Sequence, residues 1–381
     1  MLEKKEYLNE IAELDTGKAQ PLFHPYPVIN IFREDEPLKE EKKKEKPEEE
    51  KLLANKKGII YDAVETVKSQ IGVNLELEGA KLISDEAGSD ETKDAATENP
   101  EEYADFVVAM DSDAGFLKYA IGKGGAALKA TFGLVTRYGM DTDAPSLAQP
   151  AIAAENTEMI ARVLQAAAGV DKKDPMSRDA YIYEYMEALK DVDMSGMKIA
   201  ILEDHPGMEL SEMELGCYNH MLDVFEAKGA DIETVELPWS EYAIPVHEII
   251  TACEKVMTAD GLSMSLAEEE ESLAFGNWLL EEENYEKYYL KALKLRSLIK
   301  ESYDMLLRSY ALFIIPYTNG TEPYSVAANL AGLPAMTIPF VPFGAMEEDD
   351  EIVEAGLHMI AGANYENNLI KAAYAYEKEV L

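Results

Sequence analysis

The sequence has few cysteines, few histidines and no metal-binding motif, and these shortages exclude several classes of protein. Cys217 and Cys253 are the two cysteines in 381 residues, and each lies in a helical pattern without a partner at a spacing typical of a disulfide. The five histidines are scattered, with neither an HExxH motif nor a cluster with cysteine. We therefore expect no metal, no cofactor and a reducing compartment.

Long apolar runs and a surplus of basic residues are also missing. No stretch of about 18 apolar residues occurs, and the N-terminus MLEKKEYLNE lacks the apolar core of a signal peptide. With 35 basic against 74 acidic residues the formal net charge is −39, which repels phosphate backbones and anionic lipid. The composition predicts a cytoplasmic protein with no membrane contact and no direct contact with nucleic acid.

Charge divides the chain into two parts. Residues 33–57 are nearly all charged, with alternating signs, which is typical of a solvated helix or a linker. A short amphipathic helix is predicted before it, over residues 3–14. We therefore predict an N-terminal helix and charged linker over 1–57, and an α/β domain over 58–381.

Helical periodicity is clear at three places. In 154–169, apolar residues at helical spacing follow Asn156 and predict a helix. The same spacing predicts a helix over 61–72, with Gly72 as its C-terminal cap. A long helical stretch is predicted over 277–309.

Strand-like segments alternate with these helices. A β-α-β unit with parallel strands is predicted from three successive segments, at 198–203, 211–229 and 231–237. Further on, we expect a buried strand over 311–320 that is ended by Pro316, and a helix followed by a strand over 325–344. The alternation favours an α/β fold with a mixed or parallel sheet covered by helices on both faces.

Four segments spread along the chain carry recognisable motifs: KLISDEAGSDETKDAATENP (81–100), GLVTRYGMDTDAPSLAQP (133–150), EYAIPVHEIITACEKVMTADGL (241–262) and ANLAGLPAMTIP (328–339). Together they resemble the amidase signature family, which includes the A subunit of the tRNA-dependent amidotransferase that makes Gln-tRNA or Asn-tRNA. The resemblance extends over residues 55–381, with 1–50 as an N-terminal helical cap. It implies one α/β/α domain with a mixed, mostly parallel sheet of about eleven strands.

The resemblance also implies a catalytic triad of a serine nucleophile, a bridging serine in a cis peptide and a neutral lysine that acts as base. The nucleophile belongs to a Gly-Gly-Ser turn, and the matching tripeptide here is Gly124-Gly125-Ala126, in which a methyl group replaces the hydroxyl. The two glycines are therefore interpreted as the remnant of an oxyanion-hole turn. In the loop of the bridging serine, Ser112 and Gly115 are the only matches, and two aspartates flank Ser112.

A base lysine is not found at the expected place. The nearest candidate segments, 26–35 and 54–60, lack either the lysine or its strand context. Lys118 and Lys123 could supply an amine, but in so acidic a chain we expect them to be surface charges.

The substrate side of the family site is better preserved, because Tyr317 and Thr318 match the residues that line its amide pocket. The family fold is thus expected to be kept while its reactive groups are missing. The leading hypothesis is therefore that this chain is a catalytically inactive relative of the glutamine-hydrolysing A subunit, which would serve as a scaffold or bind a partner. The implied partners are the amidotransferase B and C subunits or an intact A subunit, and the implied ligand is a small amide or amino acid. The alternative is an active amide hydrolase, a glutaminase or amidase, that uses rearranged residues such as Ser112.

Overall fold

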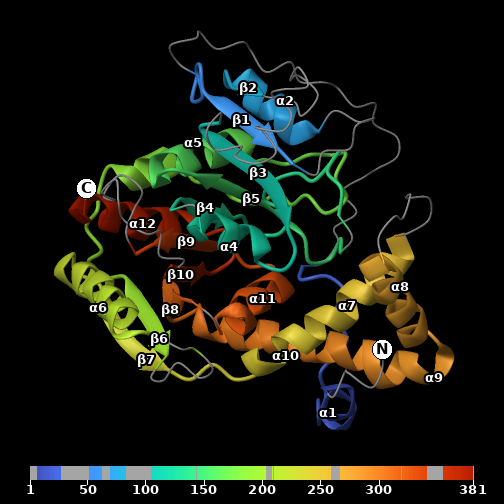
Figure 1. The fold of residues 1–381 in the computed structure, drawn as a ribbon. Helices are drawn as coiled ribbons and strands as arrows, with labels where there is room; N and C mark the ends of the chain where they lie inside the picture. Colours follow the sequence, from blue (N-terminus) through green and yellow to red (C-terminus); the bar gives the residue numbers. More distant parts are fainter. Residues whose placement is uncertain are drawn as a thin grey trace.

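A ten-stranded sheet forms the centre of the molecule. The computed structural model describes residues 7–26, 51–61, 69–82, 104–122, 124–142, 144–202, 208, 210–258, 267–318, 320–340 and 355–380. Within these residues the strand order is β2-β1-β3-β5-β4-β9-β10-β8-β6-β7. Helices pack against both faces of the sheet (Figure 1), which confirms the predicted α/β class.

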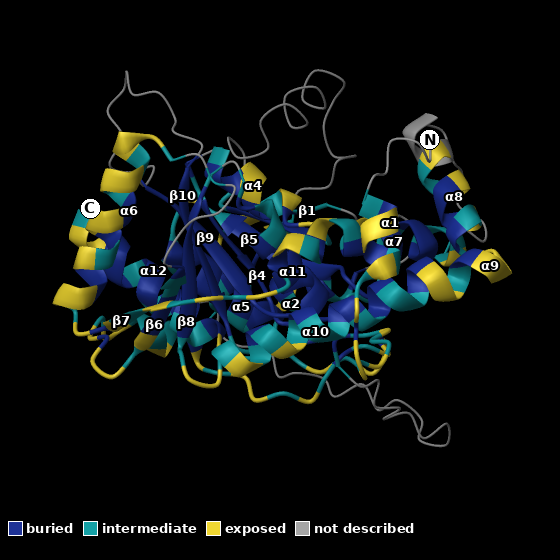
Figure 2. Ribbon diagram, turned by 90° about the horizontal axis from the view of Figure 1, so that it is seen from below, coloured by how far each residue is buried: buried dark blue, intermediate teal, exposed yellow. Residues whose placement is uncertain are grey.

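The central strands are rich in Ala, Val, Ile and Leu and are almost wholly buried (Figure 2), as expected of strands covered on both faces. The strand bounds are β1 Lys57–Ile60, β2 Lys81–Leu82, β3 Phe106–Asp111, β4 Ala126–Lys129, β5 Gln149–Ala154, β6 Lys198–Leu202, β7 Asp231–Val235, β8 Leu312–Tyr317, β9 Ala335–Pro339 and β10 Gly356–Ala361.

The sheet is mixed, as predicted, and the predicted parallel pairing is present in part. Parallel pairing is confined to its two ends, in β2-β1-β3 and β8-β6-β7. The strands between them, from β3 to β8, pair antiparallel throughout. The predicted β-α-β unit lies at one of the two parallel ends. The antiparallel centre has no comparable local sequence pattern from which its strand direction could have been predicted.

The helices form two groups, one on each face of the sheet. Their bounds are α1 Tyr7–Glu13, α2 Gln70–Leu77, α4 Gly115–Gly122, α5 Thr157–Ala167, α6 Glu212–Ala227, α7 Ala243–Thr258, α8 Ala267–Leu279, α9 Glu282–Asn284, α10 Leu290–Leu306, α11 Glu322–Ala331 and α12 Glu366–Val380. Helices α2, α5, α6 and α12 bury their apolar sides on one face, and α1, α4, α7, α8, α10 and α11 on the other.

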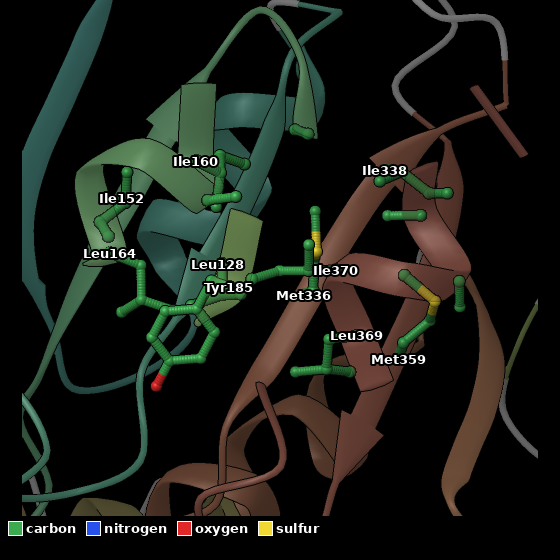
Figure 3. Close-up of a cluster of buried hydrophobic side chains, with 14 of the residues drawn as sticks. Leu128, Ile152, Ile160, Leu164, Tyr185, Met336, Ile338, Met359, Leu369 and Ile370 are labelled. Carbon is green, nitrogen blue, oxygen red and sulfur yellow. The ribbon is translucent and has the colours of Figure 1, made fainter. Parts of the chain in front are cut away.

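Two apolar cores result, one on each side of the sheet. Figure 3 shows part of the first core, to which Leu128 of β4, Met336 of β9 and Ile160 of α5 contribute fully buried side chains. On each strand alternate side chains enter the first core and the second, because successive strand residues point to opposite faces. This alternation determines which polar side chains meet on the second face.

Several local predictions are confirmed. Helix α5 begins after Asn156, whose side chain accepts a hydrogen bond from the Met159 N–H, as an N-cap should. Strands β6 and β7 pair in parallel on either side of α6, which carries a capping box formed by Ser211 and Glu214. Local hydrogen bonding and apolar periodicity are sufficient to specify these elements.

Other local predictions are wrong at their boundaries. Gly72 lies inside α2 instead of ending a helix, because Ser69 caps the N-terminus of α2 by accepting from the Gly72 N–H; residues 62–68 lie outside the described residues. Pro316 lies within β8 and pairs with Leu357, since β8 continues to Tyr317. The long helical stretch over 277–309 is interrupted after α8 and by a π-helical turn at Tyr285–Tyr289.

The division of the chain at residue 57 stays a prediction; β1 starts at that residue. No helix in the described part of the chain combines the length and apolar character needed to cross a membrane.

Candidate functional site

A row of polar side chains lies on the second face of the sheet, under α4 and α11. On β4, Ala126 and Leu128 belong to the first core and Ala127 to the second, so Lys129 points to the second face. The same alternation places further polar residues of neighbouring strands on that face: Asp111 of β3, Thr337 of β9, His358 of β10 and Tyr317 of β8. Polar groups from five strands therefore share one buried layer.

Lys129 is the charged centre of this layer. Its side chain has no exposed surface, and its Nζ donates a hydrogen bond of 2.6 Å to Oδ1 of Asn329 on α11. The Nδ2 of Asn329 in turn donates to the backbone oxygen of Asp111 at 3.0 Å. The carboxamide of Asn329 thus connects the lysine of β4 with the end of β3.

Burial changes the protonation of these groups. Loss of solvation lowers the pKa of Lys129 to about 8, although the negative charges of Asp111 and Asp113 act in the opposite direction. Burial raises the pKa of Asp111, opposed by the charge of Lys129. At neutral pH the lysine therefore loses its proton more easily than an exposed lysine does.

His358 is the second unusual member of the layer. It is fully buried, and neither ring nitrogen has a hydrogen-bond partner in the described residues. Burial, together with the charge of Lys129, lowers the pKa of His358 to about 3, so its ring stays neutral at physiological pH. Its ring centroid lies 5.7 Å from that of Tyr317.

The N-terminus of α4 borders this layer, and two amide groups there are occupied. The Ala114 N–H donates to Oδ1 of Asp111 at 2.6 Å, and the Gly115 N–H donates to Oδ1 of Asp113 at 2.9 Å. Free N–H groups at a helix start can hold an anion. Here two carboxylates of the chain already accept from them.

Ser112 lies between these two aspartates and is half-buried. Its backbone oxygen contacts Nε2 of His247 at 2.9 Å. Among the described residues its hydroxyl forms no hydrogen bond with a lysine. The structure therefore brings Ser112 to the edge of the polar layer without pairing it with a base.

The tripeptide Gly124-Gly125-Ala126 turns the chain from α4 into β4. The Gly124 N–H donates to the Ile121 oxygen at 2.8 Å, and the Gly125 N–H donates to the Ala120 oxygen at 3.0 Å. Gly124 has a φ of +71°, which favours glycine at the end of a helix. Ala126 is the first residue of β4. Both glycine N–H groups are thus engaged in ending α4 and are not available to an oxyanion.

Lys118, one of the two lysines considered as a source of an amine, does not reach the buried layer. Lys118 has an exposed side chain whose Nζ lies 3.8 Å from Oε1 of Glu322, so it is a surface charge, as predicted. Lys123 lies outside the described residues, as do residues 27–35 of a candidate lysine segment and residues 83–100 of the first family motif.

Tyr317 and Thr318 point in different directions at the end of β8. Tyr317 is buried beside His358 in the polar layer. Thr318 instead donates from Oγ1 to Oε1 of Glu214, at the start of α6. The structure therefore places Tyr317, and not Thr318, with the buried polar groups.

Sequence reasoning missed Lys129, Asn329 and His358. The signal for Lys129 was available, because it is a single charge in the apolar run AALKATFG. Asn329 and His358 carry no comparable signal, since their meeting with Lys129 depends on the order of strands β4, β9 and β10.

The arrangement holds a buried lysine whose pKa is lowered, but among the described residues it offers no hydroxyl for that lysine to activate. A nucleophile and its base must lie within hydrogen-bond reach of each other. The hydrogen-bond partner of the Lys129 amine is a carboxamide, which is not a nucleophile. Within the described residues no serine or threonine hydroxyl bonds to this amine.

Comparison with known proteins identifies the fold and its family. Residues 124–369 match the family described as Amidase. Among curated proteins, the A subunit of the Glutamyl-tRNA(Gln) amidotransferase of Lachnospira eligens is 30% identical over 296 residues, covering 67% of this chain and 60% of the relative. The corresponding protein of Microcystis aeruginosa is 29% identical over 314 residues, covering 71% and 64%. The chain spans about three fifths of the length of the curated relatives it matches.

Solved structures share the same architecture. The A subunit of the Glutamyl-tRNA(Gln) amidotransferase of Thermotoga maritima superposes with a TM-score of 0.68 at 19% identity, covering 85% of this chain and 83% of that one. The peptide amidase of Stenotrophomonas maltophilia gives 0.65 at 18% identity, covering 86% and 83%. Because the family match extends over more than half of the chain, this protein belongs to the amidase family.

Proposed function

We propose that this chain is a catalytically inactive member of the amidase family that acts by binding a partner. The observation that carries the proposal is the hydrogen bond between Nζ of Lys129 and Oδ1 of Asn329. The amine of this buried lysine donates to a carboxamide oxygen, whereas a lysine that acts as a base must reach the group that serves as nucleophile.

Charge around the start of α4 supports the same conclusion. Acyl transfer develops a negative oxygen that must be held by free N–H groups. The N–H groups of Ala114 and Gly115 already serve the carboxylates of Asp111 and Asp113. A developing oxyanion there would meet two negative charges in place of donors.

The proposed partners follow from the relatives, which are named as subunits of an amidotransferase. We infer that this chain associates with B- and C-type subunits of such an enzyme, or with an intact A subunit. The net charge of −39 favours a basic docking surface on the partner, since opposite potentials speed association.

The activity test compares the purified chain with a catalytically active A subunit of the same family. Both are incubated with glutamine and with an aryl amide, alone and with B and C subunits, and ammonia or aryl amine is measured. We expect product from the active family member only. Turnover by this chain that is lost in Ser112→Ala would refute the inactive assignment.

The binding test uses tagged B, C and intact A subunits from the source organism. We expect one of them to co-elute with this chain in size-exclusion chromatography, and increasing salt to weaken the complex because its charges are screened. If this chain elutes separately from all three subunits at low salt, the proposed partners are wrong.

A second candidate function, amide hydrolysis by rearranged residues, has one observation in its favour. Burial lowers the pKa of Lys129 to about 8, and neutral lysines serve as bases in catalysis. If Lys129 is the base, Lys129→Met abolishes hydrolysis, whereas Leu128→Met on the opposite face of the same strand leaves it unchanged.

A further inference from the structure

A cavity whose lining carries three basic side chains lies away from the polar layer, between the segment that precedes β1 and the first turns of α5. Its volume is about 380 Å³, which falls in the lower part of the range of small-molecule sites, about 300–1,000 Å³. The residues that define its chemistry are Lys51, Lys56, Asn156, Glu158, Met159 and Arg162.

The charge of this lining is opposite to that of the chain. Lys51, Lys56 and Arg162 contribute three positive charges, and Glu158 contributes one negative charge. In the whole sequence acidic residues outnumber basic ones by 74 to 35. Three cations therefore surround one concave volume, although Arg162 pairs with Glu158 and Lys56 pairs with Asp105, so that the cations exceed these two carboxylates by one.

The cations are held in place by the fold. Arg162 donates from Nη1 to the backbone oxygen of Leu52 at 3.3 Å and from Nη2 to Oε1 of Glu158 at 2.6 Å. These contacts fix the guanidinium between α5 and the segment before β1. A positioned guanidinium matches the planar geometry of carboxylate and phosphate groups.

Lys56 reaches the cavity from the turn before β1. Its Nζ bonds to Oδ1 of Asp105 at 3.0 Å, and the two side chains are 41% and 34% exposed. Such partly exposed pairs contribute little free energy, so Lys56 can share its charge with a bound anion. Met159 and the neighbouring Leu52 and Ala54 supply an apolar part of the lining that suits a short carbon chain.

We propose that this cavity binds a small organic dianion, a phosphate monoester or a short dicarboxylate, with its charged group on Lys56 and Arg162. The shared chemistry is two negative charges on oxygen, one for each of the two contacting cations, whose present partners are Asp105 for Lys56 and Glu158 for Arg162. The site is separate from the Lys129 layer, so its test is independent of the proposed function.

The experiment measures binding of inorganic phosphate, glutarate and acetate to the full chain by isothermal titration calorimetry at low and high sodium chloride. We expect saturable binding of phosphate or glutarate, at least about fivefold tighter than acetate, and weakened by salt. Binding of phosphate alone identifies a phosphorylated ligand, and binding of glutarate alone identifies a dicarboxylate. Absence of saturable binding by both overturns the proposal.

Variants locate the binding. Lys56→Gln and Arg162→Gln should each weaken binding about fivefold or more, because each removes one charge-assisted contact. The matched control is Lys198→Gln, since Lys198 also pairs with an acidic neighbour, Glu233, but begins β6 near the other end of the sheet. Thermal unfolding without ligand shows whether each variant is folded. The site is refuted if Lys198→Gln weakens the affinity for the anion as much as the two site variants do, or if Lys56→Gln does not weaken it.

Discussion

Replacing Lys129 by methionine tests the electrostatics of the buried layer. Burial lowers the pKa of this lysine from 10.5 to about 8 in the folded chain. At about 1.4 kcal/mol for each pKa unit, the charged form is disfavoured by about 3 kcal/mol on folding. This cost is present in full below pH 8 and is relieved as the pH rises from about 8 towards 10.5, because the unfolded chain then holds a proton that the folded chain has released.

The expected result is a change in the pH dependence of stability. Methionine fills a similar volume without a charge, so the variant lacks the gain in stability that the wild type shows at alkaline pH. The free energy of unfolding of Lys129→Met relative to wild type should therefore fall by about 2 kcal/mol between about pH 7 and about pH 9.5. The loss of a donor to Asn329 adds about 1–3 kcal/mol of destabilisation that does not vary with pH.

Urea denaturation at several pH values measures this difference directly. The free energy of unfolding of the variant is subtracted from that of the wild type at each pH. The difference removes the contribution of other titrating groups, such as Tyr185 and Tyr303, whose pKa values burial raises. Leu128→Met, on the opposite face of β4, controls for a core substitution and should keep the wild-type pH dependence. Parallel curves for Lys129→Met and wild type would refute the assignment of a depressed lysine pKa.

Three further predictions concern stability and reactivity. Gly332→Ala should destabilise the fold by about 1–3 kcal/mol, measured by urea denaturation, because Gly332 has a φ of +70° and an added Cβ would lie 2.6 Å from Pro25. Glu377→Ala should cost about 1–2 kcal/mol in the same assay, since Glu377 accepts from both the N–H and the hydroxyl of Thr157 at the start of α5; an unchanged midpoint contradicts that capping role. Cys253 should react with a thiol reagent far more slowly in the native than in the unfolded chain, because burial raises the pKa of its thiol.

Local sequence patterns predicted the elements whose hydrogen bonds close within a few residues. The capping box of Ser211 and Glu214 and the N-cap of Asn156 are of this kind, and both occur as expected. Gly72 shows the limit of such patterns, because it was predicted to end a helix but lies in the first turn of α2. The N-cap at Ser69, seen in the structure, shows that the helix starts just after that residue.

The position of the glycine turn illustrates a different limit. Motif similarity placed Gly124-Gly125-Ala126 at a catalytic turn, whereas the structure uses the same residues to end α4 and begin β4. A short glycine motif is compatible with both roles, since its backbone freedom serves either one. In this structure the two glycine N–H groups donate to Ile121 and Ala120, and the relation of the turn to a catalytic turn stays a prediction.

The sequence alone determined the α/β class, the β-α-β unit around α6 and the resemblance to the amidase family, because these depend on periodicity and on contiguous motifs. Only the tertiary structure decided that Lys129, Asn329 and Asp111 meet, since they are contributed by β4, α11 and β3, up to 218 residues apart. Strand order and the alternation of side chains bring them onto one face, and burial between sheet and helices then changes their protonation.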